Sequence, residues 1–335
     1  MKPTIYDVAR EAGVSIATVS KILNGKGKIS PSTKRRVLEV IERLGYQPNL
    51  LASALTGKRT YTFGLLIPDV ANPFFAEVAR SVEDRGQALG FTVILCSTDN
   101  RDDRLARYLA VLRQKRVDGL IIGTGVDDPR LLAALKEEGL PFTLIARDLP
   151  SLPVTSVRVD DFVGGYLAAQ HLLELGHRKM VVLTESMTVM SSQERVRGFR
   201  QALEEAGVAF ADVAVHTCAA RVDDGRRKAL KVLDAADRPT AIFAGNDLIA
   251  IGVLQAAKEK GMTVPDDLSV VGFDNTVLAT ICDPPLTTVA QPIEEMGKQV
   301  VDLLLRELGG EAEVKQRVIL RPELIVRAST APPRQ

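Results

Sequence analysis

Two sets of side chains in this sequence are suited to molecular recognition, and the first lies in residues 4–24. Apolar residues recur there at helical spacing on either side of Gly13, which marks a turn between two short helices. Ser15 can cap the second helix by accepting a hydrogen bond from a free backbone N–H. In a helix-turn-helix of this kind, the second helix places small, polar and basic side chains against base edges in the DNA major groove. The predicted DNA contacts are Thr4, Tyr6, Ser15, Ile16, Ala17, Thr18, Ser20, Lys21 and Asn24.

The second set follows short apolar segments that alternate with amphipathic helices after residue 61. Ligands of open parallel sheets bind beyond the C-terminal ends of the strands, so polar residues that follow strands are candidate contacts. Aromatic rings stack on the CH faces of a sugar, and Asp, Asn and Arg pair with its hydroxyl groups. The predicted ligand contacts are Asn72, Phe74, Phe75, Asp99, Thr124, Arg147, Asp160, Arg195, Phe243, Asn246 and Asp274.

Each set also has a simpler interpretation that the sequence leaves open. Residues 4–24 are compatible with two helices of an ordinary helical domain whose polar face is solvated. The polar residues after the strands are compatible with solvated loops, helix caps and salt bridges between parts of the fold.

Catalytic and metal-binding patterns are not found. His171, His177 and His216 show no metal-ligand spacing, and the sequence contains no glycine-rich phosphate loop or nucleophile elbow. Residues 123–125, Gly-Thr-Gly, follow an apolar strand but lack the rest of a dinucleotide-binding fingerprint. We therefore expect a protein that is not an enzyme and uses no cofactor and no metal.

The charge distribution supports a nucleic-acid partner for the N-terminal region. Residues 1–60 contain 11 Lys and Arg against 4 Asp and Glu, whereas the remaining residues contain 32 against 38. One basic module on an acidic body is the balance that binding to the phosphate backbone requires. With 335 residues, of which 46% are apolar, the chain is long enough for two or three globular domains.

The cellular compartment is inferred from the cysteines and from the hydropathy of the sequence. Cys96, Cys218 and Cys282 lie far apart and form no CxxC pair, which is typical of reduced thiols. No N-terminal signal peptide is visible, and no apolar run reaches the roughly 18 residues that would span a membrane. We expect a cytoplasmic protein with no membrane partner.

The order of predicted elements gives the domain organisation. A third helix begins after Ser30 and ends at Gly45, so residues 1–46 form a helix-turn-helix domain. Residues 47–60 contain a short helix and a linker. From residue 61, strands alternate with helices in two successive sets, which predicts two doubly wound α/β lobes with parallel sheets.

Residues 4–24 resemble the N-terminal motif of the lac repressor/galactose repressor family of bacterial transcription regulators. The similarity includes Val14-Ser15, Thr18-Val19-Ser20 and Leu23-Asn24, and it continues to the C-terminus. It implies an effector-binding and dimerisation domain over residues 61–335, with the fold of periplasmic sugar-binding proteins. The chain would cross between lobes near Asp160, Ala290 and Pro322. The implied lobes are residues 61–160 with 291–321, and residues 161–289 with 323–335.

The same resemblance implies roles for individual residues. Asn49 and Leu55 belong to a hinge helix that folds when two copies pair over a pseudo-palindromic operator, and Leu55 wedges into the minor groove. Arg195, Asn246 and Asp274 match positions that commonly hold the effector, with aromatic contacts near Phe74 and Phe243.

The sequence departs from the family pattern at three positions. Lys21 and Ser53 stand where the family often has arginine, and Ala146 stands where it often has an aspartate that accepts a ligand hydroxyl. The missing acceptor favours a ligand that needs fewer contacts on that side, or one that bears a charge toward Arg147.

These observations predict a homodimeric transcription repressor controlled by a small-molecule effector, a sugar or a sugar derivative. The alternatives are the same scaffold responding to a purine or to a protein co-repressor, and, more distantly, a sugar-binding transport component. The basic N-terminal domain argues against the transport component.

Overall fold

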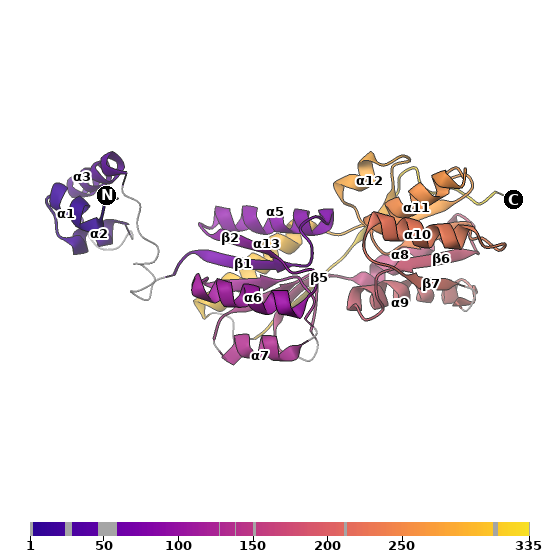
Figure 1. Ribbon diagram of the computed structural model, residues 1–335, viewed down its shortest axis with the longest axis horizontal. Helices are drawn as coiled ribbons and strands as arrows, with labels where there is room; N and C mark the ends of the chain where they lie inside the picture. Colours follow the sequence, from indigo (N-terminus) through magenta and orange to yellow (C-terminus); the bar gives the residue numbers. More distant parts are fainter. Residues whose placement is uncertain are drawn as a thin grey trace. The chain divides into compact units, whose positions relative to one another are not determined.

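The computed structural model describes residues 3–23, 29–45, 59–126, 128–137, 139–149, 152–210, 213–310 and 314–334. The chain divides into two compact units, residues 1–60 and residues 61–335. The N-terminal unit is indigo in Figure 1, and the second unit follows in purple to yellow.

The N-terminal unit is the expected three-helix domain. Its helices are α1 (Ile5–Glu11), α2 (Ile16–Leu23) and α3 (Pro31–Leu44). Thr4 and Asp7 form a capping box at the start of α1, and Ser30 caps α3 by accepting from the Thr33 N–H. Gly13, with φ of 63°, makes the turn between α1 and α2 in the left-handed region that favours glycine. The small core consists of Val8, Ala9, Ala12, Val19, Ile22, Val37 and Val40.

The first lobe of the second unit contains a parallel six-stranded sheet. Its strands, in spatial order, are β11 (Arg317–Leu320), β5 (Thr155–Val159), β4 (Phe142–Ile145), β3 (Gly119–Ile122), β1 (Thr62–Ile67) and β2 (Thr92–Ser97). Helices α5 (Pro73–Ala88) and α13 (Ile293–Gly309) bury their apolar stripes on one face, and α6 (Asp102–Gln114) and α7 (Pro129–Glu137) cover the other.

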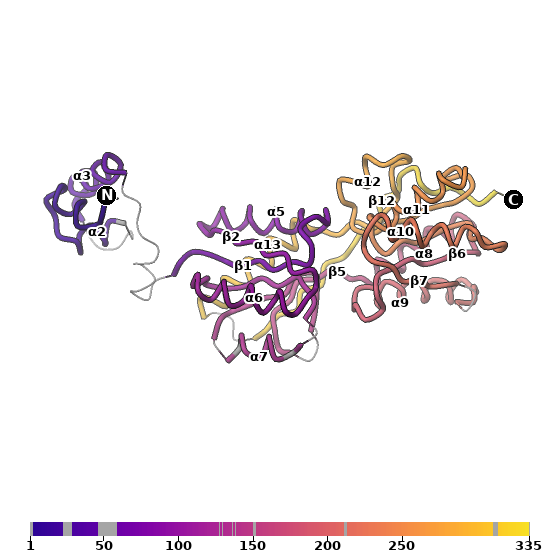
Figure 2. Tube along the Cα trace, viewed as in Figure 1, coloured from indigo at the N-terminus to yellow at the C-terminus, as the bar shows by residue number. Residues whose placement is uncertain are grey.

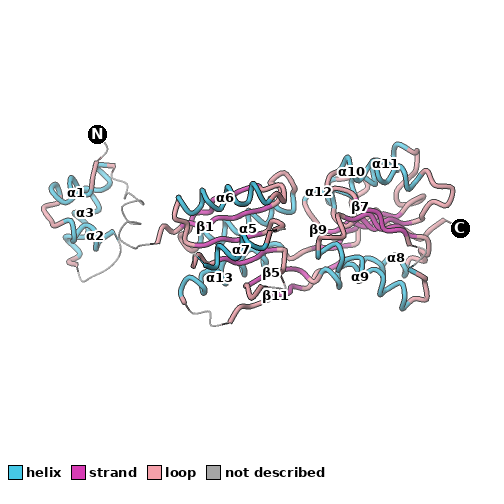
Figure 3. Tube along the Cα trace, turned by 60° about the horizontal axis from the view of Figure 1, so that its bottom comes forward, coloured by secondary structure: helices cyan, strands magenta, loops and turns pink. Residues whose placement is uncertain are grey.

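The second lobe repeats this design with another six-stranded sheet. Its strands, in spatial order, are β12 (Glu323–Ile325), β10 (Thr287–Ala290), β9 (Ser269–Asp274), β8 (Ala241–Ala244), β6 (Met180–Thr184) and β7 (Ala214–Thr217). Helices α8 (Asp161–Glu174) and α9 (Met190–Glu205) pack on one face, and α10 (Val222–Leu233) and α11 (Asp247–Glu259) pack on the other. Figure 3 shows these helices above and below the sheet, with the short α12 (Val277–Ile281) beyond β9.

The chain passes between the lobes at three points, which can be followed in Figure 2. They lie between β5 and α8 at Asp160, between β10 and α13, and between β11 and β12. The predicted fold class, a helix-turn-helix domain followed by two doubly wound α/β lobes, is confirmed. One strand was missed: β12 is only three residues long and pairs antiparallel with β10 at the sheet edge.

A hydrogen bond between α12 and α5 links the lobes outside the ligand cavity. The backbone N–H of Val277, the first residue of α12, donates to Glu77 Oε1 on α5 at 3.1 Å. Thr276 precedes this helix but does not cap it, because its hydroxyl donates to Asp247. The first turn of α12 is therefore capped by a carboxylate from the other lobe.

Two glycines let α8 and α9 approach backbone to backbone. A Cβ added at Gly165 would lie 1.9 Å from the carbonyl oxygen of Arg195, and one at Gly198 would lie 1.9 Å from that of Phe162. We expect Gly165→Ala and Gly198→Ala each to lower the free energy of unfolding by about 1–3 kcal/mol or more, because the helices must separate. Urea denaturation of the full chain measures this.

The control for these variants is Gly86→Ala on α5. The nearest atom to its added Cβ is Val93 Cγ2 at 3.2 Å, a contact that a shift of a few tenths of an ångström relieves, and alanine also favours the helix over glycine. We therefore expect a much smaller loss in the free energy of unfolding than at Gly165 or Gly198. Equal effects at all three positions would contradict the role assigned to the α8–α9 contact.

Candidate functional site

The exposed face of α2 carries three of the predicted DNA contacts. Val19 and Ile22 are buried in the three-helix core, whereas Ile16, Ala17 and Lys21 are exposed on the opposite side. Ser15 caps the helix, since its Oγ accepts from the Thr18 N–H at 3.1 Å. The geometry agrees with a recognition helix that is anchored by one face and free on the other.

The other predicted DNA contacts divide into three groups. Thr4 is exposed but holds the capping box of α1, and Tyr6 is 68% exposed beside it. Thr18 and Ser20 are half-buried along the edge of α2. Asn24, Asn49 and Leu55 lie outside the described residues, as does most of the predicted hinge segment.

Lys21 is the exposed basic residue of α2, and we expect it to contact a base. Its ammonium can donate to guanine O6 and N7, so Lys21→Ala should weaken operator binding by about 1–3 kcal/mol, mostly at one base pair per half-site. Fluorescence anisotropy on operators with single base-pair changes measures this. An equal loss on operator and on random DNA would instead assign Lys21 to a phosphate.

A cavity of about 780 Å³ opens where the strand ends of the two sheets face each other. This volume lies within the usual range for small-molecule sites, and side chains of both lobes line it. Nine predicted ligand contacts come together here: Asn72, Phe74, Phe75, Asp99, Thr124, Arg147, Arg195, Asn246 and Asp274.

Arg195 is held rigidly on the second-lobe side of the cavity. Its Nε donates to Asp161 Oδ1 at 2.8 Å, its Nη1 donates to the carbonyl oxygen of Gly245, and its guanidinium stacks 3.6 Å from the centroid of the Phe273 ring. Both members of the Arg195–Asp161 pair are over 90% buried. Such a pair is costly to break, because the remaining charge would stay buried without a partner.

Asp274 ends β9 at the same wall and is buried. Gln291 Nε2 donates to its Oδ1 at 2.7 Å. Burial raises the pKa of Asp274 well above its usual value, while the nearby Arg195 charge opposes that rise. A carboxyl group in this state can accept ligand hydroxyl protons when ionised, or donate one when neutral.

Another buried acid, Asp247, fixes the backbone near Asp274. It accepts from the Thr276 backbone N–H at 2.7 Å, from the Thr276 hydroxyl at 3.0 Å and from the Thr288 hydroxyl at 2.7 Å. Burial raises the pKa of Asp247 to about 6, and these hydrogen bonds limit the rise. The network ties the β9–α12 connection and β10 to the start of α11.

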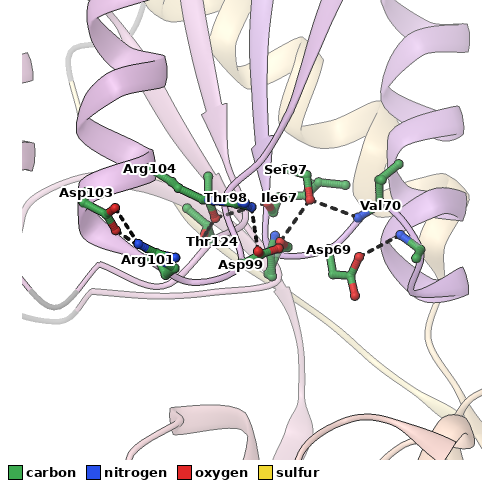
Figure 4. Close-up of polar contacts among 12 residues, drawn as sticks. Ile67, Asp69, Val70, Ser97, Thr98, Asp99, Arg101, Asp103, Arg104 and Thr124 are labelled. Carbon is green, nitrogen blue, oxygen red and sulfur yellow. Dashed lines mark hydrogen bonds and ion pairs between the residues drawn. The ribbon is translucent and has the colours of Figure 1, made fainter.

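The first-lobe side is a connected polar network at the ends of β1, β2 and β3, part of which is shown in Figure 4. The hydroxyls of Thr98 and Thr124 hydrogen-bond to each other. Asn100 Oδ1 accepts from Thr124 Oγ1 at 3.3 Å, from the Gly125 N–H at 2.9 Å and from Arg147 Nη2 at 3.2 Å. Asp99 forms an ion pair with Arg104 at 2.5 Å. These contacts hold the side chains in place before any ligand arrives.

Two predicted ligand contacts do not line this cavity. Phe243 is fully buried in the second-lobe core, where its ring stacks on Phe199 with centroids 5.2 Å apart. Asp160 caps α8 by accepting from the Val163 N–H at 3.1 Å. Asn246, three residues after Phe243, and Asp161, directly after Asp160, line the cavity.

Several cavity residues were not predicted. Asp161, Gln291, Glu185 and Arg158 all line the cavity. Gln291 follows β10, so the strand-end rule would have found it if β10 had been placed in the second-lobe sheet. Arg158 lies within a strand and gave no comparable signal.

Two negative findings apply to the described residues. Within them, no cluster of His, Cys, Asp and Glu side chains has an arrangement that could hold a metal ion. None of the helices in the same part of the chain is long and apolar enough to cross a membrane.

Comparison with known proteins settles the family. The chain is 46% identical over 335 residues to the HTH-type transcriptional regulator DegA of Bacillus subtilis (strain 168), covering 99% of each sequence. The chain belongs to the lacI family. The family model described as bacterial regulatory proteins, lacI family, matches residues 4–49, and a periplasmic binding protein-like domain matches residues 169–330.

Solved structures support lacI-family membership and the fold. The lac repressor dimer bound to operator and the anti-inducer ONPF has a TM-score of 0.88 and 28% identity, covering 99% of this chain and all of that chain. A LacI family regulator of Enterococcus faecium with bound ribose has a TM-score of 0.75 and 33% identity, covering 81% of this chain and 99% of that one. This lacI-family chain is a DNA-binding transcription regulator, and its relatives are transcription regulators rather than enzymes.

Proposed function

We propose that this lacI-family regulator represses transcription as a homodimer on a pseudo-palindromic operator, and that a polyhydroxylated small molecule in the cavity controls it. The single observation that supports this best is the presence, in one chain, of a recognition helix with an exposed face and a cavity lined by two lobes. The related proteins with bound operator or bound ribose agree with both parts.

The proposed control works through the three connections between the lobes. A ligand that contacts both lobes favours one relative arrangement of the lobes and shifts the population toward it. If that arrangement has a different affinity for operator DNA, a coupling of about 1–3 kcal/mol changes the affinity about 5- to 150-fold. A co-repressor and an inducer differ only in the sign of this coupling.

The proposed domain boundaries are those expected from the sequence: residues 1–46 for DNA recognition, 47–60 for the hinge and 61–335 for effector binding and dimerisation. The proposed site residues are the nine predicted residues that line the cavity. A regulator that acts on chromosomal DNA works in the cytoplasm, which is where we place this protein.

The proposal is tested by selecting an operator from random duplex DNA with the full chain and then adding sugars and sugar derivatives. The expected result is a pseudo-palindromic site, bound by a dimer, whose affinity changes with one class of ligand. Selection of an asymmetric site by a monomer, or the absence of any selected sequence, would contradict the proposal.

Leu55 gives a separate test of the hinge. We expect Leu55→Ala to reduce DNA bending and specific affinity without changing dimerisation, because a leucine wedge unstacks a base step. Gel mobility of circularly permuted operator fragments measures the bend, and sedimentation measures the dimer. Undistorted operator DNA in the wild-type complex would exclude a wedge at this position.

A further inference from the structure

The charged side chains that line the ligand cavity are unevenly paired. Arg195 is neutralised by Asp161, but Arg158 of β5 has no ion pair among the described residues. Its Nη1 donates only to the carbonyl oxygen of the next residue, Val159, at 3.3 Å. A half-buried guanidinium in the cavity wall therefore keeps its positive charge without a carboxylate partner.

The Nε atom of Arg158 also lacks a hydrogen-bond partner among the described residues, although it is buried. Buried donors in proteins nearly always have a partner, because leaving one unpaired costs free energy. The guanidinium fork matches the geometry of a carboxylate or phosphate, which two parallel N–H groups can bind at once.

The residues around Arg158 leave it available to a ligand. Burial raises the pKa of Asp161, and the charges of Arg195 and, to a smaller extent, Arg158 oppose that rise. The Asp161 carboxylate forms its hydrogen bond with Arg195 and not with Arg158. Asp148 is held by the Leu149 N–H at 2.8 Å and by Arg317 at 3.4 Å. Neither acid forms an ion pair with Arg158 in the described structure.

A second guanidinium lies in the cavity lining, just after the neighbouring strand β4. The Ala146 N–H, at the end of β4, donates to the Val157 carbonyl oxygen beside Arg158 at 2.8 Å, and the Ala146 side chain is a single methyl group. The next residue, Arg147, places a second guanidinium in the lining, oriented by Gly123 O at 2.9 Å and by Asn100.

We propose that the ligand of this cavity is a polyhydroxylated compound with a carboxylate or phosphate group, and that Arg158 binds this anionic group. The hydroxyl groups then face Arg195, Asp274 and Gln291 on the opposite wall. The inference rests on the proposed function in one respect, namely that the cavity is the effector site.

The test compares matched anionic and neutral compounds by calorimetry with the full chain. The pairs are D-glucuronate with D-glucose, D-gluconate with D-glucitol, and D-ribose 5-phosphate with D-ribose. We expect at least one anion to bind about 10- to 100-fold more tightly than its neutral partner, the range for a hydrogen bond to a charged group. Preference for glucuronate or gluconate would identify the anionic group of the ligand as a carboxylate. Preference for ribose 5-phosphate would identify it as a phosphate.

Arg158 variants connect this preference to the residue. Arg158→Gln should reduce the anion preference to about one, and Arg158→Lys should restore part of it, because lysine keeps the charge but lacks the fork. Arg80→Gln removes one exposed charge of α5, outside the cavity, and should leave the preference unchanged. The melting temperature of each variant shows that it is folded.

The outcomes separate this inference from the proposed function. If no anion binds more tightly than its neutral partner, or if Arg158→Gln keeps the preference, the inference is overturned. A neutral sugar that releases operator DNA would overturn it while leaving the proposed regulator intact. Should Arg158→Gln fail to fold, the wild-type preference and Arg158→Lys still decide the result.

Discussion

Removal of residues 1–58 is expected to abolish specific operator binding while ligand binding stays intact. The deleted segment contains the whole helix-turn-helix, and residues 61–335 form a compact unit with their own two sheets. Specific sites are typically bound about 10³- to 10⁷-fold more tightly than random DNA, and the truncated chain should lose this entire difference. Anisotropy on operator and random duplexes measures the DNA part, and calorimetry measures the ligand part.

The control is a full chain in which Lys34, Arg35 and Arg36 at the start of α3 are changed to alanine. All three are exposed, and loss of phosphate contacts should weaken binding to operator and random DNA alike. The slope of log affinity against log salt should fall by about 0.9 for each lost contact. Specific binding by residues 59–335 alone would exclude the N-terminal unit as the recognition module.

Substitutions of Arg195 and Asp274 are expected to remove the effector response while operator binding remains. Arg195→Ala removes the guanidinium from the second-lobe wall of the cavity, and Asp274→Ala removes the acid from the same wall. Each leaves buried partners unpaired, at a cost of about 1–3 kcal/mol, or more where a charge is involved. Calorimetry with the identified effector and anisotropy with operator DNA measure the two properties separately.

Milder variants separate binding from folding. Arg195→Lys keeps a positive charge beside Asp161, so the fold should persist although the fork is lost. Asp274→Asn keeps the side-chain shape and the contact with Gln291, and it resembles the neutral acid that burial favours. Unchanged effector affinity in both variants would mean that the ligand lies elsewhere and that these residues only stabilise the lobes.

Local patterns were sufficient for much of the fold. Gly13 and the helical spacing around it located the turn between α1 and α2, and Ser15 and Ser30 are the helix caps that the sequence indicated. The alternation of strands and helices located both lobes, since each apolar run in a parallel sheet is buried on both faces. The three-residue β12 was missed because so short an edge strand has no periodic pattern.

The cavity residues that lie at strand ends were predicted from the sequence. Those whose position depends on the tertiary structure were missed. Asp274 is the last residue of β9 and Thr124 comes two residues after β3, so both lie at the C-terminal ends of parallel strands, as the rule requires. Phe243 lies inside β8, so its side chain points into the packed face of the sheet rather than beyond its end. Asp160 and Asp161 are adjacent acids after β5, and the sequence does not indicate which of them lines the cavity. The position of α9 decides this, because it places Arg195 within hydrogen-bond distance of Asp161.

The cap that Glu77 provides to α12 has a mechanical consequence. The backbone of this five-residue helix is satisfied at its start by a residue that belongs to the other lobe. Any rotation that carries α5 away therefore exchanges the Glu77 carboxylate at the Val277 N–H for water and weakens the cap of the first turn. Val277 and Ile281 are 59% and 70% exposed on this helix. A change in the angle between the lobes would therefore act on the stability of a helix that carries two exposed apolar side chains.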